Sequence, residues 1–167
     1  RRLELDLPVG LLSFEAMWRE FLLVAEGAGS KSPFFERHDL NVIVEAPMGS
    51  LDPSILDEAL ASLIDEGLVV DAIVAKSEAE RMKFWALRES SYEFVPKLPR
   101  GVGFDVSIPL DKMVAALDMM RSSIPGITVG LQWIVFGHLA DSNLHVRVFP
   151  PSFSEELKLK IERMVYG

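Results

Sequence analysis

The stretch TVGLQWIVFGHLADSNLHVRVF, residues 128–149, decides the fold because two apolar runs enclose one short polar loop. Residues 128–138 and 143–149 each predict a strand, since every second residue of the later run is apolar and period-two alternation is typical of strands. The segment GVGFDVSIP, residues 101–109, alternates in the same way and predicts a third strand. A hairpin beside another strand indicates a sheet with one face in the core.

Helices are expected to alternate with these strands along the chain. Capping residues, a proline and glycines mark their ends: Ser13, Asp52 and Ser77 as N-caps, Pro53 at a first helical position, Glu80 in a capping box, and Gly27 and Gly67 as stops. The expected helices are residues 14–27, 53–66, 78–93, 113–120 and 154–165, and the remaining strands are residues 40–47 and 68–75. This order predicts an α+β class with a ferredoxin-like, largely antiparallel sheet covered on one face by helices.

The chain of 167 residues is acidic, with 17 Lys and Arg against 25 Asp and Glu and a formal net charge of −8. Such a surface repels phosphate backbones and anionic lipids, so nucleic acid and membrane surfaces are not expected partners. No apolar run reaches the roughly 18 residues that a transmembrane segment needs, and neither glycine-rich phosphate-binding motif occurs. The absence of cysteine excludes disulfides, thiolate metal sites and cysteine nucleophiles, and favours a reducing, cytoplasmic location.

The polar loop carries two of the three histidines, His138 and His145, at its ends. If the flanking strands pair as a hairpin, these residues are expected to lie opposite each other with Cβ atoms about 4.5–5.5 Å apart. Asn143 and Arg147 share the face of His145, so this face is polar and both imidazoles could reach one metal ion. The simpler interpretation is an ordinary turn capped by Asp141, and a metal site needs a third ligand.

Three ordered motifs resemble a known family. FGHLADSNLH, residues 136–145, resembles the GHxGDGNLH signature in the C-terminal domain of FAD-linked oxidases of the vanillyl-alcohol-oxidase type. FWALRES, residues 84–90, resembles the W-x-x-R-E helix of that domain, and FDVSIPLDKM, residues 104–113, resembles its DVSVP strand and the helix that follows. The family includes D-lactate, D-2-hydroxyglutarate and glycolate dehydrogenases.

The resemblance implies a site built by this chain and a cofactor bound mainly elsewhere. Full-length members carry an N-terminal FAD-binding domain, so residues 1–167 are expected to form a single substrate or cap domain without that domain and without the C-terminal tail. By position, His138 and His145 are the expected catalytic residues and ligands of a divalent metal, often zinc, which orients a 2-hydroxy acid and lowers the pKa of its hydroxyl. Arg88 and Asn143 are the expected substrate-binding residues.

The local sequence leaves two interpretations of Arg88 open. The arginine borders the apolar face of its helix, where a planar guanidinium suits a substrate carboxylate. It could equally form an internal salt bridge with a neighbour such as Glu89 or Asp105, because ionised groups near a core are usually paired. His38 lies in an expected loop and is interpreted as a surface residue.

The chain departs from the family pattern in three respects. Ala140 and Ser142 replace the two glycines of the signature, so the loop is expected to differ in backbone conformation. Gly103 stands where D-2-hydroxyglutarate dehydrogenases carry a lysine, so a second carboxylate would lack that partner and a lactate-like substrate is favoured. The family's third metal ligand, a glutamate, belongs to a later segment that the 167 residues do not include.

The leading hypothesis is the substrate- and metal-binding domain of an FAD-dependent D-2-hydroxy-acid dehydrogenase, inactive as an isolated fragment. Its expected partners are the 2-hydroxy-acid substrate, its own FAD-binding domain and, in a homo-oligomer, a second copy. The alternative is a stand-alone ferredoxin-like module that binds a small ligand or a partner without catalysis. A metal-dependent hydrolase fragment is a weaker third hypothesis, because spacing identifies no general base.

Overall fold

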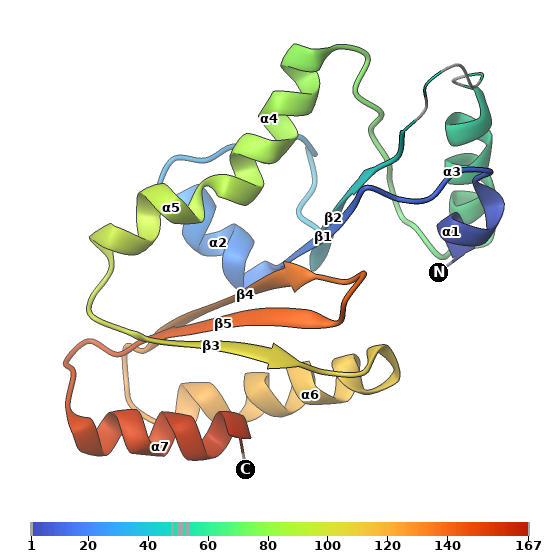
Figure 1. Ribbon diagram of the computed structural model, residues 1–167. Helices are drawn as coiled ribbons and strands as arrows, with labels where there is room; N and C mark the ends of the chain where they lie inside the picture. Colours follow the sequence, from blue (N-terminus) through green and yellow to red (C-terminus); the bar gives the residue numbers. More distant parts are fainter. Residues whose placement is uncertain (1, 48, 50–51, 53, 167) are drawn as a thin grey trace.

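Five strands form one antiparallel sheet at the centre of the computed structural model, in the order β2-β1-β4-β5-β3 (Figure 1). The strands are β1 (Ser13–Trp18), β2 (Leu40–Glu45), β3 (Val102–Ser107), β4 (Gln132–His138) and β5 (Asn143–Phe149). The structure describes residues 2–47, 49, 52 and 54–166. The expected α+β class with antiparallel pairing is confirmed.

Helices lie on both faces of this sheet (Figure 1). The helices α6 (Leu110–Ser123) and α7 (Glu155–Tyr166) cover one face, as expected, and pack on alternate residues of β3, β4 and β5. A second group, α2 (Arg19–Gly27), α4 (Glu78–Glu89) and α5 (Ser91–Phe94), lies against part of the other face, and the 3₁₀ turn η1 (Val95–Lys97) follows α5. The second face therefore has an apolar part under helices and a polar part near the β4–β5 loop.

The order of β3, α6, β4 and β5 explains the ferredoxin-like character. Both β3 and β4 pair antiparallel with β5, so they run parallel to each other with β5 between them. The helix α6, extended by the 3₁₀ turn η2 (Ile124–Gly126), makes the crossover. Its buried residues Met113, Leu117 and Met120 recur at helical spacing and face the sheet, which gives the apolar contact that fixes the crossover.

A small separate core lies beside β1 and β2, where α1 (Arg2–Asp6) packs against α3 (Ser54–Asp65). The helix α1 was not expected from the sequence. The predicted cap of α3 is confirmed, because the Asp52 carboxylate accepts a 2.9 Å hydrogen bond from the Ser54 N–H, and this bond lowers the pKa of the Asp52 carboxyl. Gly67 has a φ of 71° and ends the helix as predicted, whereas Pro53 lies outside the described residues.

The first expected helix is wrong over its first five residues, since residues 14–18 belong to β1. This strand pairs with β2 on one side and β4 on the other, and these long-range ladders override the local helical pattern. Ser13 consequently begins a strand and caps no helix. Gly27 is the last residue of α2, and its own backbone is not left-handed. The left-handed residue after the helix is Gly29, with a φ of 101°.

The strand expected at residues 68–75 is also wrong. This segment contains no strand, and Val70 is 81% exposed. An apolar run becomes a strand only where another edge pairs with it, and residues 68–75 have no ladder partner in the part of the chain that the structure describes. No helix among the described residues has the length and apolar character needed to cross a membrane.

The helix α4 begins as predicted, because the Ser77 side chain accepts a 3.2 Å hydrogen bond from the Glu80 N–H. The Glu80 carboxylate completes the cap one residue earlier than a standard box, by accepting from the Lys76 N–H at 2.7 Å. The expected single helix to about residue 93 is divided, since α4 ends at Glu89 and α5 begins at Ser91.

Candidate functional site

The two loop histidines lie on one face of the sheet, but their predicted register is wrong. His138 is opposite Asn143 on β5, and His145 is opposite Phe136 on β4. Because the two histidines are offset by an even number of residues, they still share a face and become diagonal neighbours. Their ring centroids lie 5.1 Å apart with the rings nearly perpendicular, at 87°. The predicted convergence is therefore present, and Asn143 lies beside it.

Each of these imidazoles contacts a carboxylate through Nδ1. The Nδ1 atom of His138 lies 2.5 Å from Oε1 of Glu15, and Nδ1 of His145 contacts Oδ1 of Asp105. An ionised carboxylate only accepts hydrogen bonds, so the proton is assigned to Nδ1 in both rings. No hydrogen bond within the described residues uses Nε2 of either ring. In the tautomer with its proton on Nδ1, each ring presents Nε2 as an unused electron-pair donor, and the carboxylate behind the ring fixes its orientation.

A buried ion pair joins the histidine site to α4. The Nε atom of Arg88 donates to Oε2 of Glu15 at 2.9 Å, and both side chains are only 8% exposed. The Arg88 guanidinium carbon also lies 4.6 Å from the centroid of the Phe136 ring. The internal salt bridge considered for Arg88 is therefore present, but its partner is Glu15 and neither of the two neighbours named above. Glu15 bridges Arg88 and His138.

A second carboxylate, Glu45 on β2, contacts the same face of α4 nearer to the N-terminus of the helix. Its Oε1 atom accepts from Nε1 of Trp85 at 2.9 Å and from Arg81 at 2.6 Å. The carboxylates of Glu78 and Glu45 raise the pKa of Arg81, which stays charged. Trp85 therefore donates to a carboxylate on β2, and Arg88 donates to a carboxylate on β1. The W-x-x-R spacing thus fixes the position of α4 relative to both strands.

The loop between the histidines has a conformation that glycine would favour. Ser142 has a φ of 61°, the one non-glycine positive φ among the described residues. The Asp141 carboxylate accepts from the Asn143 N–H at 3.2 Å, which confirms the predicted loop cap. Serine in place of the signature glycine therefore leaves residue 142 in the left-handed conformation that glycine favours. The side chain of serine adds strain at this position.

The substitution Ser142→Gly is expected to raise the free energy of unfolding by about 0.5–1 kcal/mol. Relief of a left-handed non-glycine residue exceeds the extra chain entropy that glycine brings to the unfolded state. Urea unfolding of the two proteins measures the difference. The matched control is Ala140→Gly at the other signature position, where φ is not positive. It is expected to lower stability, and a gain of equal size in both variants would contradict the strain at Ser142.

The donor set fits two ligands of a metal site. No group of three or more His, Cys, Asp or Glu side chains arranged to hold a metal ion occurs among the residues that the structure describes. His138 and His145 provide two imidazole nitrogens with carboxylates behind them, an arrangement typical of metal-binding histidines. The described residues therefore supply two of the ligands that such a site needs.

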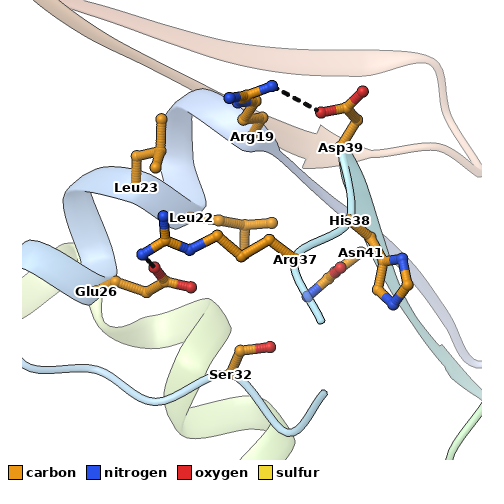
Figure 2. A pocket seen from close by; sticks show the side chains of 9 residues that line it. All are labelled: Arg19, Leu22, Leu23, Glu26, Ser32, Arg37, His38, Asp39 and Asn41. Carbon is orange, nitrogen blue, oxygen red and sulfur yellow. Dashed lines mark hydrogen bonds and ion pairs between the residues drawn. The ribbon is translucent and has the colours of Figure 1, made fainter. Parts of the chain in front are cut away.

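His38 lies in a different place, lining a cavity of about 150 Å³ between α2 and the start of β2 (Figure 2). It is half-buried, with its Nε2 atom buried and without a partner among the described residues, so the surface interpretation is wrong. Arg19 and Arg37 line the same cavity but are paired with Asp39 and Glu26. His38 contributes nothing to the pair of His138 and His145.

Sequence reasoning missed Glu15, the residue that links the pair to the core. The signal was present, because Phe14, Ala16 and Trp18 alternate with Glu15 and Met17. The structure places Ala16 and Trp18 in one core and Met17 in the other. An interpretation of this segment as a strand would have placed Glu15 on the face opposite Trp18.

Comparison with known proteins agrees with the three motifs. The family described as FAD linked oxidases, C-terminal domain, matches residues 7–167. The chain belongs to this family. The resemblance inferred from the motifs is confirmed, and membership supports the dehydrogenase hypothesis over a stand-alone module or a hydrolase fragment.

Relatives of this FAD-linked oxidase C-terminal domain are named as D-2-hydroxy-acid dehydrogenases. A probable mitochondrial D-2-hydroxyglutarate dehydrogenase of Oryza sativa subsp. indica is 29% identical over 162 residues, which cover 93% of this chain and 28% of the relative. The mitochondrial D-2-hydroxyglutarate dehydrogenase of Rattus norvegicus is 29% identical, over 82% of the chain and 24% of the relative. A putative mitochondrial D-lactate dehydrogenase of Schizosaccharomyces pombe is 24% identical, over 86% and 30%. The chain thus spans less than a third of their length.

Proposed function

We propose that the chain is the substrate- and metal-binding domain of an FAD-dependent dehydrogenase that oxidises a D-2-hydroxy acid to the 2-oxo acid. The observation that carries the proposal is the pair of His138 and His145, each backed by a carboxylate, beside a buried arginine on a sheet face. Family membership and the names of the relatives support the class of substrate. Those names include both a monocarboxylic and a dicarboxylic acid.

His138 and His145 would hold the divalent metal, expected to be zinc, through their Nε2 atoms. Glu15 and Asp105 contact Nδ1 of each ring, so each Nε2 already points away from its carboxylate and neither ring has to turn when it binds the metal. Such a metal would supply Lewis acidity, which lowers the pKa of the substrate hydroxyl and orients the hydroxyl and carboxylate.

Arg88 and Asn143 would bind the substrate. Nε of Arg88 is used by Glu15, while no hydrogen bond among the described residues engages its Nη atoms. The guanidinium is held by Glu15 on one edge and by the Phe136 ring on one face, so it loses little freedom when it binds a carboxylate. Asn143 is opposite His138, so its amide is placed to contact a polar group held at the histidines.

FAD would be bound mainly by the N-terminal domain of the full-length protein, and would supply the acceptor for the hydride. The face of His138 and His145 would then meet that domain, and the isolated chain is expected to be inactive. A homo-oligomer is a further expectation, and so is the cytoplasmic location inferred from the absence of cysteine.

The test is the anaerobic absorption spectrum of the full-length protein while D-2-hydroxy acids are added one at a time. The expected result is a bound flavin whose absorption band is bleached by one acid and by none of the L enantiomers. A protein without flavin, or a flavin that no hydroxy acid reduces, would contradict the proposal.

In the full-length protein, His138→Ala is expected to lower kcat/KM by at least about 100-fold. Loss of one ligand should weaken metal binding more than loss of a group behind the ligand, which typically costs 10–100-fold. Metal content by elemental analysis should fall in parallel, while the melting temperature should change little, because His138 is partly exposed at a strand end. Full activity after exhaustive chelation would overturn the metal role. The matched control is His38→Ala, which should keep the metal.

A further inference from the structure

The cavity beside His38 contains a second buried polar group without a partner. Asn41 on β2 is only 6% exposed, and its Oδ1 atom is buried with no hydrogen-bond partner among the described residues. Asn41 is opposite Met17, which belongs to the core that α2 covers, so the Asn41 side chain faces α2. Figure 2 shows the amide pointing from β2 toward the cavity. A buried amide without a partner is rare in folded proteins, and this one indicates a missing ligand.

The charged groups that line the cavity are already paired (Figure 2). The Nη2 atom of Arg37 lies 2.6 Å from Oε2 of Glu26, and the Nη1 atom of Arg19 lies 3.4 Å from Oδ1 of Asp39. Two guanidinium groups and two carboxylates cancel, so these four side chains favour neither an anion nor a cation. A ligand held between them should be uncharged.

The free polar groups of the cavity match the edge of a carboxamide. The Asn41 amide offers an acceptor oxygen and a donor NH2 group side by side. No hydrogen bond among the described residues uses either group. A primary carboxamide has the same two groups, so the two amides can pair through two antiparallel hydrogen bonds. The buried Nε2 atom of His38 is available for a third hydrogen bond.

The walls and the volume of the cavity limit the rest of the ligand. Leu22 and Leu23 line the cavity from α2 and give it apolar surface beside the amide. The Arg19 N–H donates a 2.8 Å hydrogen bond to the Asp39 carbonyl, which joins the start of α2 to the start of β2. The volume of about 150 Å³ equals that of about five water molecules. The cavity therefore suits a ligand of about five non-hydrogen atoms.

We infer that this cavity binds a small uncharged primary carboxamide. Asn41 recognises the amide of the ligand, and Leu22 and Leu23 contact its short alkyl part. The site is distinct from the metal and substrate site, because neither His138 nor His145 lines the cavity. The inference goes beyond the proposed function and does not depend on it, since it uses none of the residues assigned to metal or substrate.

The test measures the binding of propanamide to the full-length protein by saturation-transfer NMR, with propionate and butanone as matched probes. The three molecules have the same number of non-hydrogen atoms, but propionate is an anion and butanone has no N–H donor. Propanamide is expected to bind with a Kd of about 1 mM, a value in the range for so small a ligand. It should bind about 10-fold more tightly than propionate or butanone, which cannot form both hydrogen bonds with Asn41.

Two variants locate the binding site. Asn41→Leu replaces the free amide by an apolar side chain of similar size, and it should weaken propanamide binding by about 10-fold. Its melting temperature should not fall, because the substitution removes a buried polar group without a partner. His38→Ala should raise the Kd by about 3-fold and keep the metal, and it tests the site even if Asn41→Leu does not fold.

The matched control is Gln132→Leu, the same kind of substitution at an exposed residue that begins β4 and does not line the cavity. It should leave the Kd for propanamide within about 2-fold. Three results would overturn the inference. If no probe binds, the cavity holds ordered water only. If propionate or butanone binds as tightly as propanamide, the cavity does not select an amide. If Asn41→Leu and His38→Ala bind propanamide as the wild type does, propanamide binds elsewhere on the protein.

Discussion

Glu15→Gln should lower the free energy of unfolding by about 3–5 kcal/mol, because it leaves a buried arginine without its counter-charge. Glu15 and Arg88 are each 8% exposed, and their 2.9 Å contact joins β1 to α4. Glutamine keeps the volume of the side chain and an oxygen acceptor, so the loss reports the charge and not a cavity. Denaturant unfolding followed by circular dichroism gives the difference.

The matched control for Glu15→Gln is the same substitution at Glu156. That residue forms a 2.9 Å ion pair with Lys160, but the two side chains are 80% and 60% exposed. Solvent screens such a pair, so Glu156→Gln should change the free energy of unfolding much less than Glu15→Gln does. Similar losses at the two positions would mean that the pair of Glu15 and Arg88 is solvated in solution. A double variant, Glu15→Gln with Arg88→Met, should recover part of the loss, because it removes both charges together.

Glu15→Gln should also weaken metal binding at the histidine site, since Glu15 contacts Nδ1 of His138. A neutral amide holds the imidazole less firmly and can present an N–H to the ring in place of an acceptor. We expect metal affinity to fall by about 10–100-fold in the full-length protein, even at temperatures where the variant is folded. Isothermal titration with zinc measures this fall.

Much of the sheet could be predicted because its signals are local. The alternation in residues 101–109 and 143–149 survives as β3 and β5, and the helical spacing of Met113, Leu117 and Met120 survives in α6. For residues 13–18 the local pattern gave the wrong element, because the spacing of Phe14, Met17 and Trp18 fits a helix as well as a strand. Only the pairing with β2 and β4, which lie far along the chain, decides between the two.

The sequence predicted which residues of the β4–β5 loop belong to the site, but it did not predict the carboxylates that contact them. His138, His145 and Asn143 follow from one motif, and their shared face follows from period two. The carboxylates behind the imidazoles come from elements 123 and 40 residues away, at Glu15 and Asp105. Sequence spacing carries no information about such contacts until the strand order is known. The hairpin register also escaped prediction, because it depends on a loop whose left-handed residue is a serine.

Gly137→Ala is the other substitution expected to have a large effect, lowering the free energy of unfolding by about 3 kcal/mol. A Cβ atom at this position would lie 2.2 Å from the backbone oxygen of Asn143 and 2.9 Å from Cα of Leu144. Both atoms belong to the backbone of β5, which cannot turn aside as a side chain can. The strands β4 and β5 must therefore separate next to His138, and overpacking of this kind typically costs 1–3 kcal/mol or more. Denaturant unfolding measures the loss, and metal binding should weaken with it, because the spacing of His138 and His145 depends on the same ladder.

Gly27→Ala provides the contrasting substitution. Nothing lies within 4 Å of a Cβ atom at Gly27, and its backbone is not left-handed. Alanine at the end of α2 should therefore raise the free energy of unfolding by about 0.5–1 kcal/mol. A lower free energy of unfolding for Gly27→Ala would mean that Gly27 is the left-handed helix stop predicted from the sequence. That result would contradict the observed backbone at the end of α2. If instead both glycine variants prove neutral, the close approach of β4 to β5 is wrong. The diagonal placement of the two histidines, on which the metal site depends, would then be wrong as well.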